Sequence, residues 1–179
     1  VPKGVELYAI NNIADLSIYG LGSANNGGGT DGEEFTFPAD TASAGDYIYV
    51  ASEAPGFTTF FGFAPNYTDG SMGINGDDAV ELFMNASVVD IYGEIDVDGS
   101  GHPWEYKDGW AYRVDDTGPD GTTWVEANWT YSGPNALDNE TSNATAATPF
   151  PIGAYLVTPP NSGITINCPA DITQPATAG

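Results

Sequence analysis

Short apolar runs, broken at close intervals by turn-forming residues, are the feature that most limits the folds open to this chain. The runs are rich in β-branched and aromatic residues and lack the 3.6-residue period of an amphipathic helix. Clusters of Gly, Pro, Asn and Asp separate them, and Asn25–Gly32 can only be a loop. The pattern predicts six to eight short strands and no helix, which is typical of an all-β sandwich.

The predicted strands follow one another along most of the chain. They are Val5–Ile10, Ala14–Leu21, Glu34–Phe37, Tyr47–Ser52, Ala79–Met84, Val88–Tyr92, Gly109–Val114 and Glu126–Tyr131. Asn85-Ala86 is the expected hairpin link between the fifth and sixth of them. Phe57–Phe63 holds four phenylalanines, a density that favours a place in the core over a wall between loops. Leu137–Pro149 is poor in large apolar residues and is expected to be coil.

The charge balance is strongly acidic. Lys3, Lys107 and Arg113 face 25 acidic residues, which gives a formal net charge of −22. Phosphate backbones and anionic membranes bind through cations, so direct nucleic-acid binding is not expected. No apolar run approaches the roughly 20 residues that cross a bilayer, so membrane insertion is not expected either. Two explanations of the acidity stay open: solubility at high salt, or capture of divalent cations.

The sequence contains no recognisable set of catalytic residues. His102 is the only histidine, and it lies in the loop Gly99–Pro103. No Gly-x-Ser-x-Gly elbow precedes a helix, and no Cys/His cluster has the spacing of a zinc site. Glycoside hydrolases use a pair of carboxylates, but such pairs are not evidence for that activity in so acidic a chain. We therefore expect a protein that is not an enzyme.

Calcium is the cofactor that the sequence predicts. The segment Asp96–Ser100 sets oxygens at alternate positions around a glycine, as the start of an EF-hand loop does. Lys107 stands at the twelfth position, where a bidentate Glu would be needed, although Glu105 can fold back. The alternative is solvated turns, since Asp-Gly pairs favour turns without a metal. The predicted calcium ligands are Asp96, Asp98, Ser100 and Glu105, with Asp77 and Asp78 as a second candidate.

A row of aromatic side chains is a candidate ligand platform. Its members lie at alternate positions and would share one face of a strand; they are Trp104, Tyr106, Trp110 and Tyr112. Exposed, such a row would stack on sugar rings or on a partner protein. Buried, it would cap one end of the sandwich, which is the expected place for large apolar groups without a binding role.

Asn-x-Ser/Thr triplets are mildly over-represented. In a eukaryote they would be glycosylation acceptors, and in a bacterium they would indicate only polar loops. The triplets begin at Asn66, Asn85, Asn128, Asn139 and Asn143.

Two stretches resemble the lamin-tail domain in the form common in secreted bacterial proteins. One is Val5–Tyr8 (VELY) followed by Ala14–Leu21 (ADLSIYGL). The other is Asn75–Phe83 (NGDDAVELF) followed by Val88–Gly93 (VVDIYG). The resemblance covers about residues 4–155. It implies an immunoglobulin-like β-sandwich that serves as a binding or tethering module without a catalytic site.

Two further features qualify that resemblance. Ala9-Ile10 stands where the family often has Asn after the Tyr, so the local loop is expected to differ. The stretch from Pro103 to Thr130 is similar to forms of the domain that precede extracellular nucleases.

The end of the chain has a different sequence pattern. Residues 158–163, with Pro159–Gly163 (PPNSG), are expected to form a linker between a sandwich at 1–157 and a new module at 164–179. Ile164–Thr173 resembles the first strand of a hyalin repeat, an extracellular adhesion module. That resemblance implies that Cys168, the only cysteine, is half of a disulfide whose partner lies outside this sequence. The alternative is a lone buried thiol in a C-terminal strand.

Together these features predict a non-catalytic adhesion or binding module of a multidomain secreted or cell-surface protein. Its expected partner is a protein or carbohydrate surface, or a second copy of itself. One alternative is an accessory domain that targets an extracellular nuclease or other hydrolase. Another is a structural subunit that assembles into a surface filament or coat. No signal peptide opens the chain at Val1-Pro2-Lys3, so an exported protein would have lost it or would carry it outside this sequence.

Overall fold

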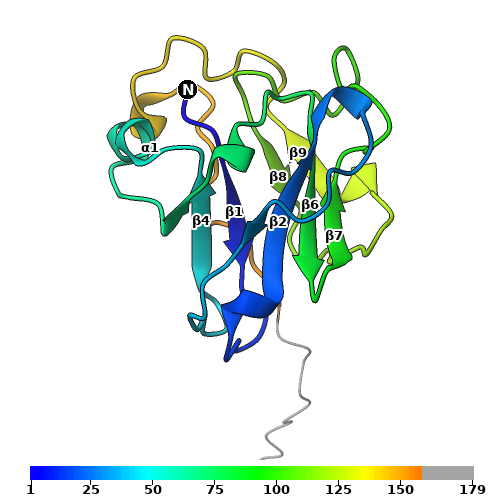
Figure 1. Cartoon of the computed structure of the whole chain (residues 1–179). Coiled ribbons are helices and arrows are strands. Elements are labelled where there is room, and N and C mark those ends of the chain that lie inside the picture. The colour runs from blue at the N-terminus through cyan, green and yellow to red at the C-terminus, as the bar shows by residue number, and fades with distance from the viewer. Residues whose placement is uncertain (159–179) are drawn as a thin grey trace, which may run out of the picture.

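The computed structural model describes residues 1–158. Residues 159–163 of the predicted linker 158–163, the hyalin-like segment 164–179 and Cys168 lie outside the described residues. Figure 1 shows strands gathered into two layers, with one short helix at an end of the β1 layer. The prediction of an all-β sandwich is confirmed.

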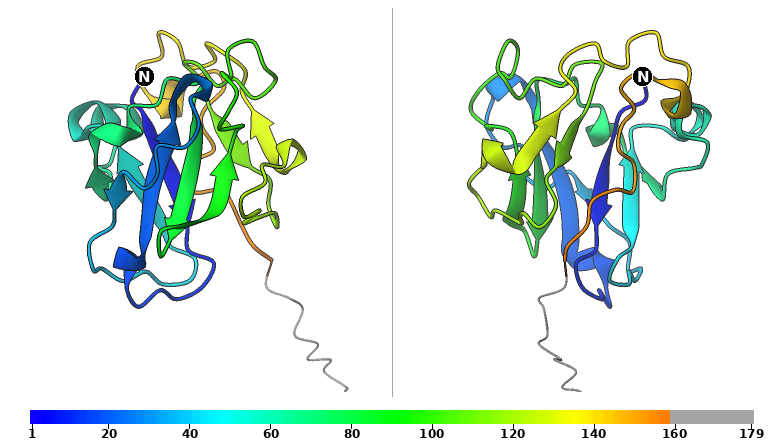
Figure 2. Two further views of the ribbon diagram at one scale, coloured as in Figure 1. Left: turned by 45° about the vertical axis from the view of Figure 1, so that its right-hand side comes forward. Right: turned by 180° about the vertical axis from the view of Figure 1, so that it is seen from behind.

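Nine strands form three sheets within residues 1–158. The first sheet has the order β1-β4-β5, the second β3-β2-β6-β7, and the third β8-β9. Their bounds are β1 Gly4–Tyr8, β2 Tyr19–Ala24, β3 Phe35–Thr36, β4 Tyr47–Ala51, β5 Tyr67–Thr68, β6 Ala79–Met84, β7 Ser87–Tyr92, β8 Ala111–Arg113 and β9 Trp129–Tyr131. All pairs are antiparallel except β4 with β5. Figure 2 shows β8 and β9 beyond β7, on the far side from β4.

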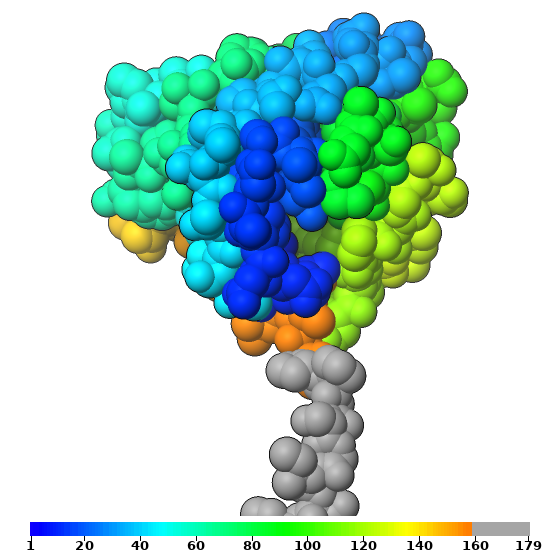
Figure 3. Space-filling view, turned by 60° about the horizontal axis from the view of Figure 1, so that its bottom comes forward, coloured from blue at the N-terminus to red at the C-terminus, as the bar shows by residue number. Residues whose placement is uncertain are grey.

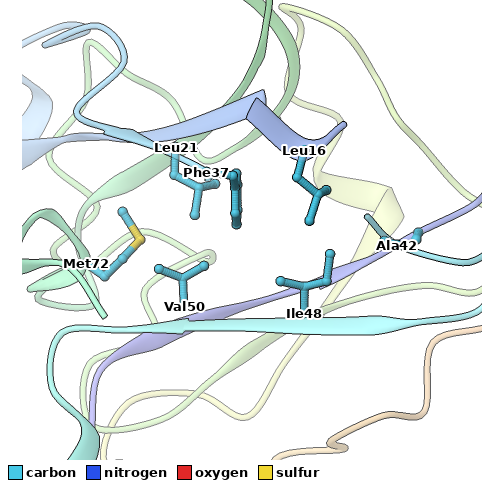
Figure 4. Packing of buried hydrophobic residues seen from close by; sticks show 8 residues of the cluster. Leu16, Leu21, Phe37, Ala42, Ile48, Val50 and Met72 are labelled. Carbon is cyan, nitrogen blue, oxygen red and sulfur yellow. The ribbon is translucent and has the colours of Figure 1, made fainter. Parts of the chain in front are cut away.

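The core lies between the first and second sheets. Leu21 of β2 faces Val50 and Ile48 of β4, and Phe37 and Met72 fill the space between them (Figure 4). Val50 and Met72 have no exposed surface. Burial of such side chains stabilises the fold by about 1.5–3 kcal/mol each.

An α-helix stands where none was predicted. Helix α1, Ala54–Phe61, follows β4 directly. The Glu53 carboxylate accepts a hydrogen bond from the N–H of Gly56, and Gly62 ends the helix at φ 84°. These are the N-cap and the left-handed C-cap that helix ends require. The expectation of a core role holds for Phe57 and Phe60, which are buried on the inner side of the helix.

Several predicted strands have shifted ends. The segment 14–21 begins with a 3₁₀ turn, Leu16–Ile18, because the Asp15 carboxylate accepts from the N–H of Ser17. The segment 126–131 likewise begins with a 3₁₀ turn, Glu126–Asn128. The short strand β5 was not predicted. The hairpin link at Asn85-Ala86 is confirmed, with φ of 50° and 59°.

One further finding concerns membranes. Among the residues that the structure describes, no helix has the length and apolar character needed to span a bilayer.

Candidate functional site

A cleft of about 840 Å³ opens beside β1, between that strand and the strands β7 and β8. We call it the β1 cleft. Apolar side chains make most of its wall, and those that lie half-buried there include Val5, Leu7, Leu82, Val89, Trp110 and Phe150. Figure 3 shows its mouth as a hollow between the dark blue N-terminal segment and the yellow-green residues. Protein interiors keep few voids larger than a water molecule, whereas ligand pockets span about 300–1,000 Å³.

The cleft lies off the free edge of β1. Val5 and Leu7 point to the core face of the first sheet. Glu6 and Tyr8 therefore point to the opposite face, because side chains alternate along a strand. All four residues line the same cleft. A cavity that touches both faces of a strand must pass around its edge.

The backbone of β1 confirms that this edge is open. Ser52 donates its N–H to the carbonyl of Lys3, and Ala9 donates to the carbonyl of Asp46, so odd-numbered residues of β1 pair with β4. The N–H and C=O groups of the intervening residues point away from β4. These residues are Gly4, Glu6 and Tyr8, and their backbone groups make no hydrogen bond within residues 1–158.

Strand β8 presents a second open edge to the cleft. Val114 donates its N–H to the carbonyl of Asn128, and Ser132 donates to the carbonyl of Trp110, so even-numbered residues of β8 pair with β9. The backbone groups of Ala111 and Arg113 point the other way and have no partner in the described part of the chain. Two unpaired strand edges thus border one apolar cleft.

Within residues 1–158, β1 and β8 are connected through side chains and not through backbone pairing. The Tyr112 hydroxyl donates to Glu6 Oε1 at 2.7 Å and accepts from the N–H groups of Ala154 and Tyr155. Glu6 Oε2 accepts from the N–H of Gly153 at 2.8 Å. Burial raises the pKa of Glu6, although the hydrogen bonds from Tyr112 and Gly153 oppose that shift. Burial and the Glu6 carboxylate raise the pKa of Tyr112.

A charged cluster joins β8 to β7. The Arg113 guanidinium binds Asp90 at 2.6 Å and Asp120 at 2.8 Å, and it lies 4.3 Å from the ring centre of Trp129. Asn128 donates to both oxygens of Asp120. Burial raises the pKa of Asp90 in spite of Arg113. Burial also acts on Asp120, but its hydrogen bonds from Asn128 and Arg113 prevail and lower the pKa.

Two of the three carboxylates of the first predicted calcium site, those of Asp98 and Glu105, accept hydrogen bonds from nearby backbone groups. Asp98 Oδ1 accepts from the N–H of Ser100, which lowers the pKa of Asp98, and Glu105 Oε2 accepts from the N–H of Gly101. Asp96 and Asp98 are both exposed. Within residues 1–158 no three His, Cys, Asp or Glu side chains converge as metal ligands would. Calcium binding by these residues stays a prediction.

The second predicted calcium site is partly used by the fold. Asp78 is fully buried and accepts from the N–H groups of Asn26 and Asn75, which ties two loops to the start of β6. Asp77 Oδ2 accepts from the Ser100 hydroxyl at 3.0 Å, while its Oδ1 is buried and has no partner among residues 1–158. The two candidate sites, separate in the sequence, are thus in contact through Asp77 and Ser100.

The four residues of the aromatic row do not share one face of a strand, and Trp104 is buried, as the alternative to an exposed platform expects. Strand β8 holds only Tyr112 of the four residues, because the chain turns repeatedly between Trp104 and Trp110. Trp104 is buried against Tyr92, and the Tyr106 hydroxyl donates to the carbonyl of Asp78. Trp110 and Tyr112 instead line the β1 cleft.

The Asn-x-Ser/Thr triplets differ in their surroundings. Asn66, Asn85 and Asn139 are exposed. Asn143 is buried; its side-chain amide donates to the carbonyl of Phe150 and accepts from the N–H of the same residue. The side-chain amide of Asn128 donates to the carboxylate of Asp120. If the protein is glycosylated, we expect glycans only at the exposed three.

His102 is exposed in a turn, and its ring bonds no carboxylate or hydroxyl in the described residues. Sequence reasoning missed Glu6 and the β1 cleft altogether. The one available signal was an acidic residue inside the apolar strand 5–10.

Comparison with known proteins gives no relative. No family model, no curated protein and no solved structure matches this chain. The resemblance to the lamin-tail domain therefore stays a prediction.

Proposed function

We propose that this chain is a non-catalytic binding module of a multidomain secreted or cell-surface protein, and that it holds its partner in the β1 cleft. The observation that carries the proposal is the cleft itself. About 840 Å³ of largely apolar space is left unfilled by residues 1–158. Apolar cavities do not retain water well, so an apolar guest lowers the free energy of the exposed walls.

The polar groups at the wall support a binding role over a catalytic one. Both carboxylate oxygens of Glu6 are engaged, one by Tyr112 and one by the N–H of Gly153. Asp90 is held by Arg113. General acid–base work needs a group free to reach the substrate, and these groups serve to hold β1, β7 and β8 in place.

Placement outside the cell rests on the sequence. A net charge of −22 keeps a protein soluble and discourages contact with nucleic acids. The resemblances to lamin-tail and hyalin modules point the same way, toward adhesion or attachment.

A neutral apolar fluorophore, N-phenyl-1-naphthylamine, tests the proposal. The full chain is titrated with the dye beside two variants, Ala111→Trp and Ala44→Trp. Ala111 lines the cleft, so an indole there occupies the dye's space, whereas Ala44 is exposed and lies outside it. We expect Ala111→Trp to weaken dye binding at least about tenfold, equivalent to about 1.4 kcal/mol, while Ala44→Trp leaves it unchanged.

Circular dichroism and thermal melts would establish that both tryptophan variants are folded. Equal dye affinity in the two variants would contradict binding in the cleft.

A further inference from the structure

The geometry points to one occupant of the β1 cleft: the chain's own segment Ile164–Cys168, inserted as a strand between β1 and β8. This inference rests on the cleft being the binding site proposed above. An inserted strand would join the β1-β4-β5 sheet to the β8-β9 sheet, and both open edges would gain a partner.

The open edges favour a polypeptide over a small apolar molecule. The cleft presents N–H and C=O groups that have no partner within residues 1–158, from Gly4, Glu6 and Tyr8 on one side and from Ala111 and Arg113 on the other. An extended peptide satisfies such groups through its backbone while its side chains fill the apolar space. A lipid-like molecule would cover the walls and leave the edges unpaired.

The tail sequence has the pattern that this space requires. Ile164, Ile166 and Cys168 alternate with Thr165 and Asn167. Side chains two apart lie on one face of a strand, so the apolar three can face the core and the polar two the opposite side.

The chain leaves the described structure at the right place for this insertion. Thr158 donates from its N–H and its hydroxyl to Asp116, a cleft residue just beyond the end of β8. The Tyr155 ring lies 5.2 Å from that of Tyr8, the last residue of β1. Figure 3 shows the orange residues that precede 159 beside the mouth of the cleft. A strand that enters from there runs antiparallel to both β1 and β8.

The linker is long enough, and the connection favours the chain's own tail over that of a second copy. Residues 159–163 can span at most about 17 Å, and loops of about 4–6 residues are the commonest connections. A segment tethered so closely acts at an effective concentration in the millimolar range. In this arrangement the tail occupies the cleft, and any other partner of the cleft must displace it.

Matching the apolar faces sets the register. Ile166 lies opposite Leu7, and Cys168 lies opposite Val5. In this register odd-numbered residues of β1 form non-hydrogen-bonded pairs with the tail, with Cα atoms about 4.5 Å apart, which is within the range of a disulfide.

The single cysteine makes this register testable. Val5→Cys in the full chain should form a disulfide with Cys168 within one molecule under mild oxidation, detected by mass spectrometry and non-reducing electrophoresis. Val125→Cys is the matched control, because Val125 is exposed and does not line the cleft. A disulfide dimer in place of the monomeric product would assign the strand to a second copy and overturn the inference. Equal yields from the two variants would overturn it as well.

A second pair of variants separates this inference from the proposed function. Ile164→Asp with Ile166→Asp removes the apolar face of the tail, and Thr165→Asp with Asn167→Asp adds the same charge on the other face. If the tail occupies the cleft in about nine molecules of ten, the first pair should strengthen dye binding about tenfold and the second should not. One outcome would refute the tail as the occupant and still support the binding site. In that outcome the dye binds equally well to both pairs of variants and to the unchanged chain, and Ala111→Trp blocks the binding. Failure of every one of these chains to bind the dye would refute both.

Discussion

The loss of Arg113 should be the most damaging single change of charge in this protein. Its guanidinium is the only cation within reach of Asp90 and Asp120 in residues 1–158, and the three side chains are 11%, 20% and 14% exposed. Arg113→Met keeps much of the side-chain volume and leaves both carboxylates without their partner.

The magnitude follows from this burial. Removing one partner of a buried ion pair costs about 3–5 kcal/mol, and the lost contact with Trp129 adds about 0.5–1 kcal/mol. Because the cluster is partly hydrated, we expect about 3 kcal/mol. For a chain of 150–250 residues this lowers Tm by about 6–12 °C.

Urea denaturation of the full chain, beside thermal melts, measures the effect. Lys107→Met is the matched control, since it removes one positive charge from an exposed side chain that forms no ion pair in the described residues. We expect that control to change stability by less than about 0.5 kcal/mol. An Arg113→Met variant as stable as Lys107→Met would refute the reasoning that this cluster holds β8 against β7.

Three further predictions concern pH, calcium and the helix. The folded-state pKa of Glu6 lies above its ordinary value of 4.5, so the folded protein holds this proton more tightly than the unfolded chain. The free energy of unfolding of the unchanged chain should therefore fall, relative to that of Glu6→Gln, as pH rises from about 4.5 through the raised pKa. Urea midpoints of the two proteins, measured at several pH values, would contradict this if they changed in parallel. Calcium should raise Tm above that in chelator if Asp96 and Asp98 bind it, and the double change to Asn should abolish the difference; identical melts of the unchanged chain would exclude a structural ion. Phe57→Ala should cost about 3–5 kcal/mol in urea denaturation, because Phe57 is buried, whereas Phe63→Ala, at an exposed position, should cost less than about 1 kcal/mol; equal costs would show that α1 does not pack as described.

The part of the fold that depends on local pattern could be predicted from the sequence. Strand β6 has its predicted bounds, and β7 differs from prediction by one residue, because continuous apolar runs flank a two-residue turn at Asn85-Ala86. Helix α1 was missed because its phenylalanines indicated only a place in the core, while the decisive signals were single capping residues, Glu53 and Gly62. Caps are weak signals when no amphipathic period stands between them.

The candidate site was beyond the reach of sequence reasoning for a different reason. Its defining contact joins Glu6 to Tyr112 across 106 positions of the chain. The edges of β1 and β8 are open because no other strand of residues 1–158 pairs with them there. Local sequence patterns do not show which strands pair. Both interpretations of the aromatic row, a ligand platform and a buried cap, assumed that one strand carries Trp104 and Tyr112 together, whereas turns separate them. For Asp98, the sequence cannot distinguish a calcium ligand from a turn cap, since both place an Asp before a Gly.

Backbone amide exchange at Glu6 and Tyr8, followed by NMR, tests the central claim most directly. Both N–H groups point into the β1 cleft, away from β4. We predict slow exchange in the full chain and fast exchange once Ile164 and Ile166 are both changed to Asp. Fast exchange in both chains would contradict an inserted tail strand, and slow exchange in both would show that the edge of β1 is already closed and that the cleft is not a binding site.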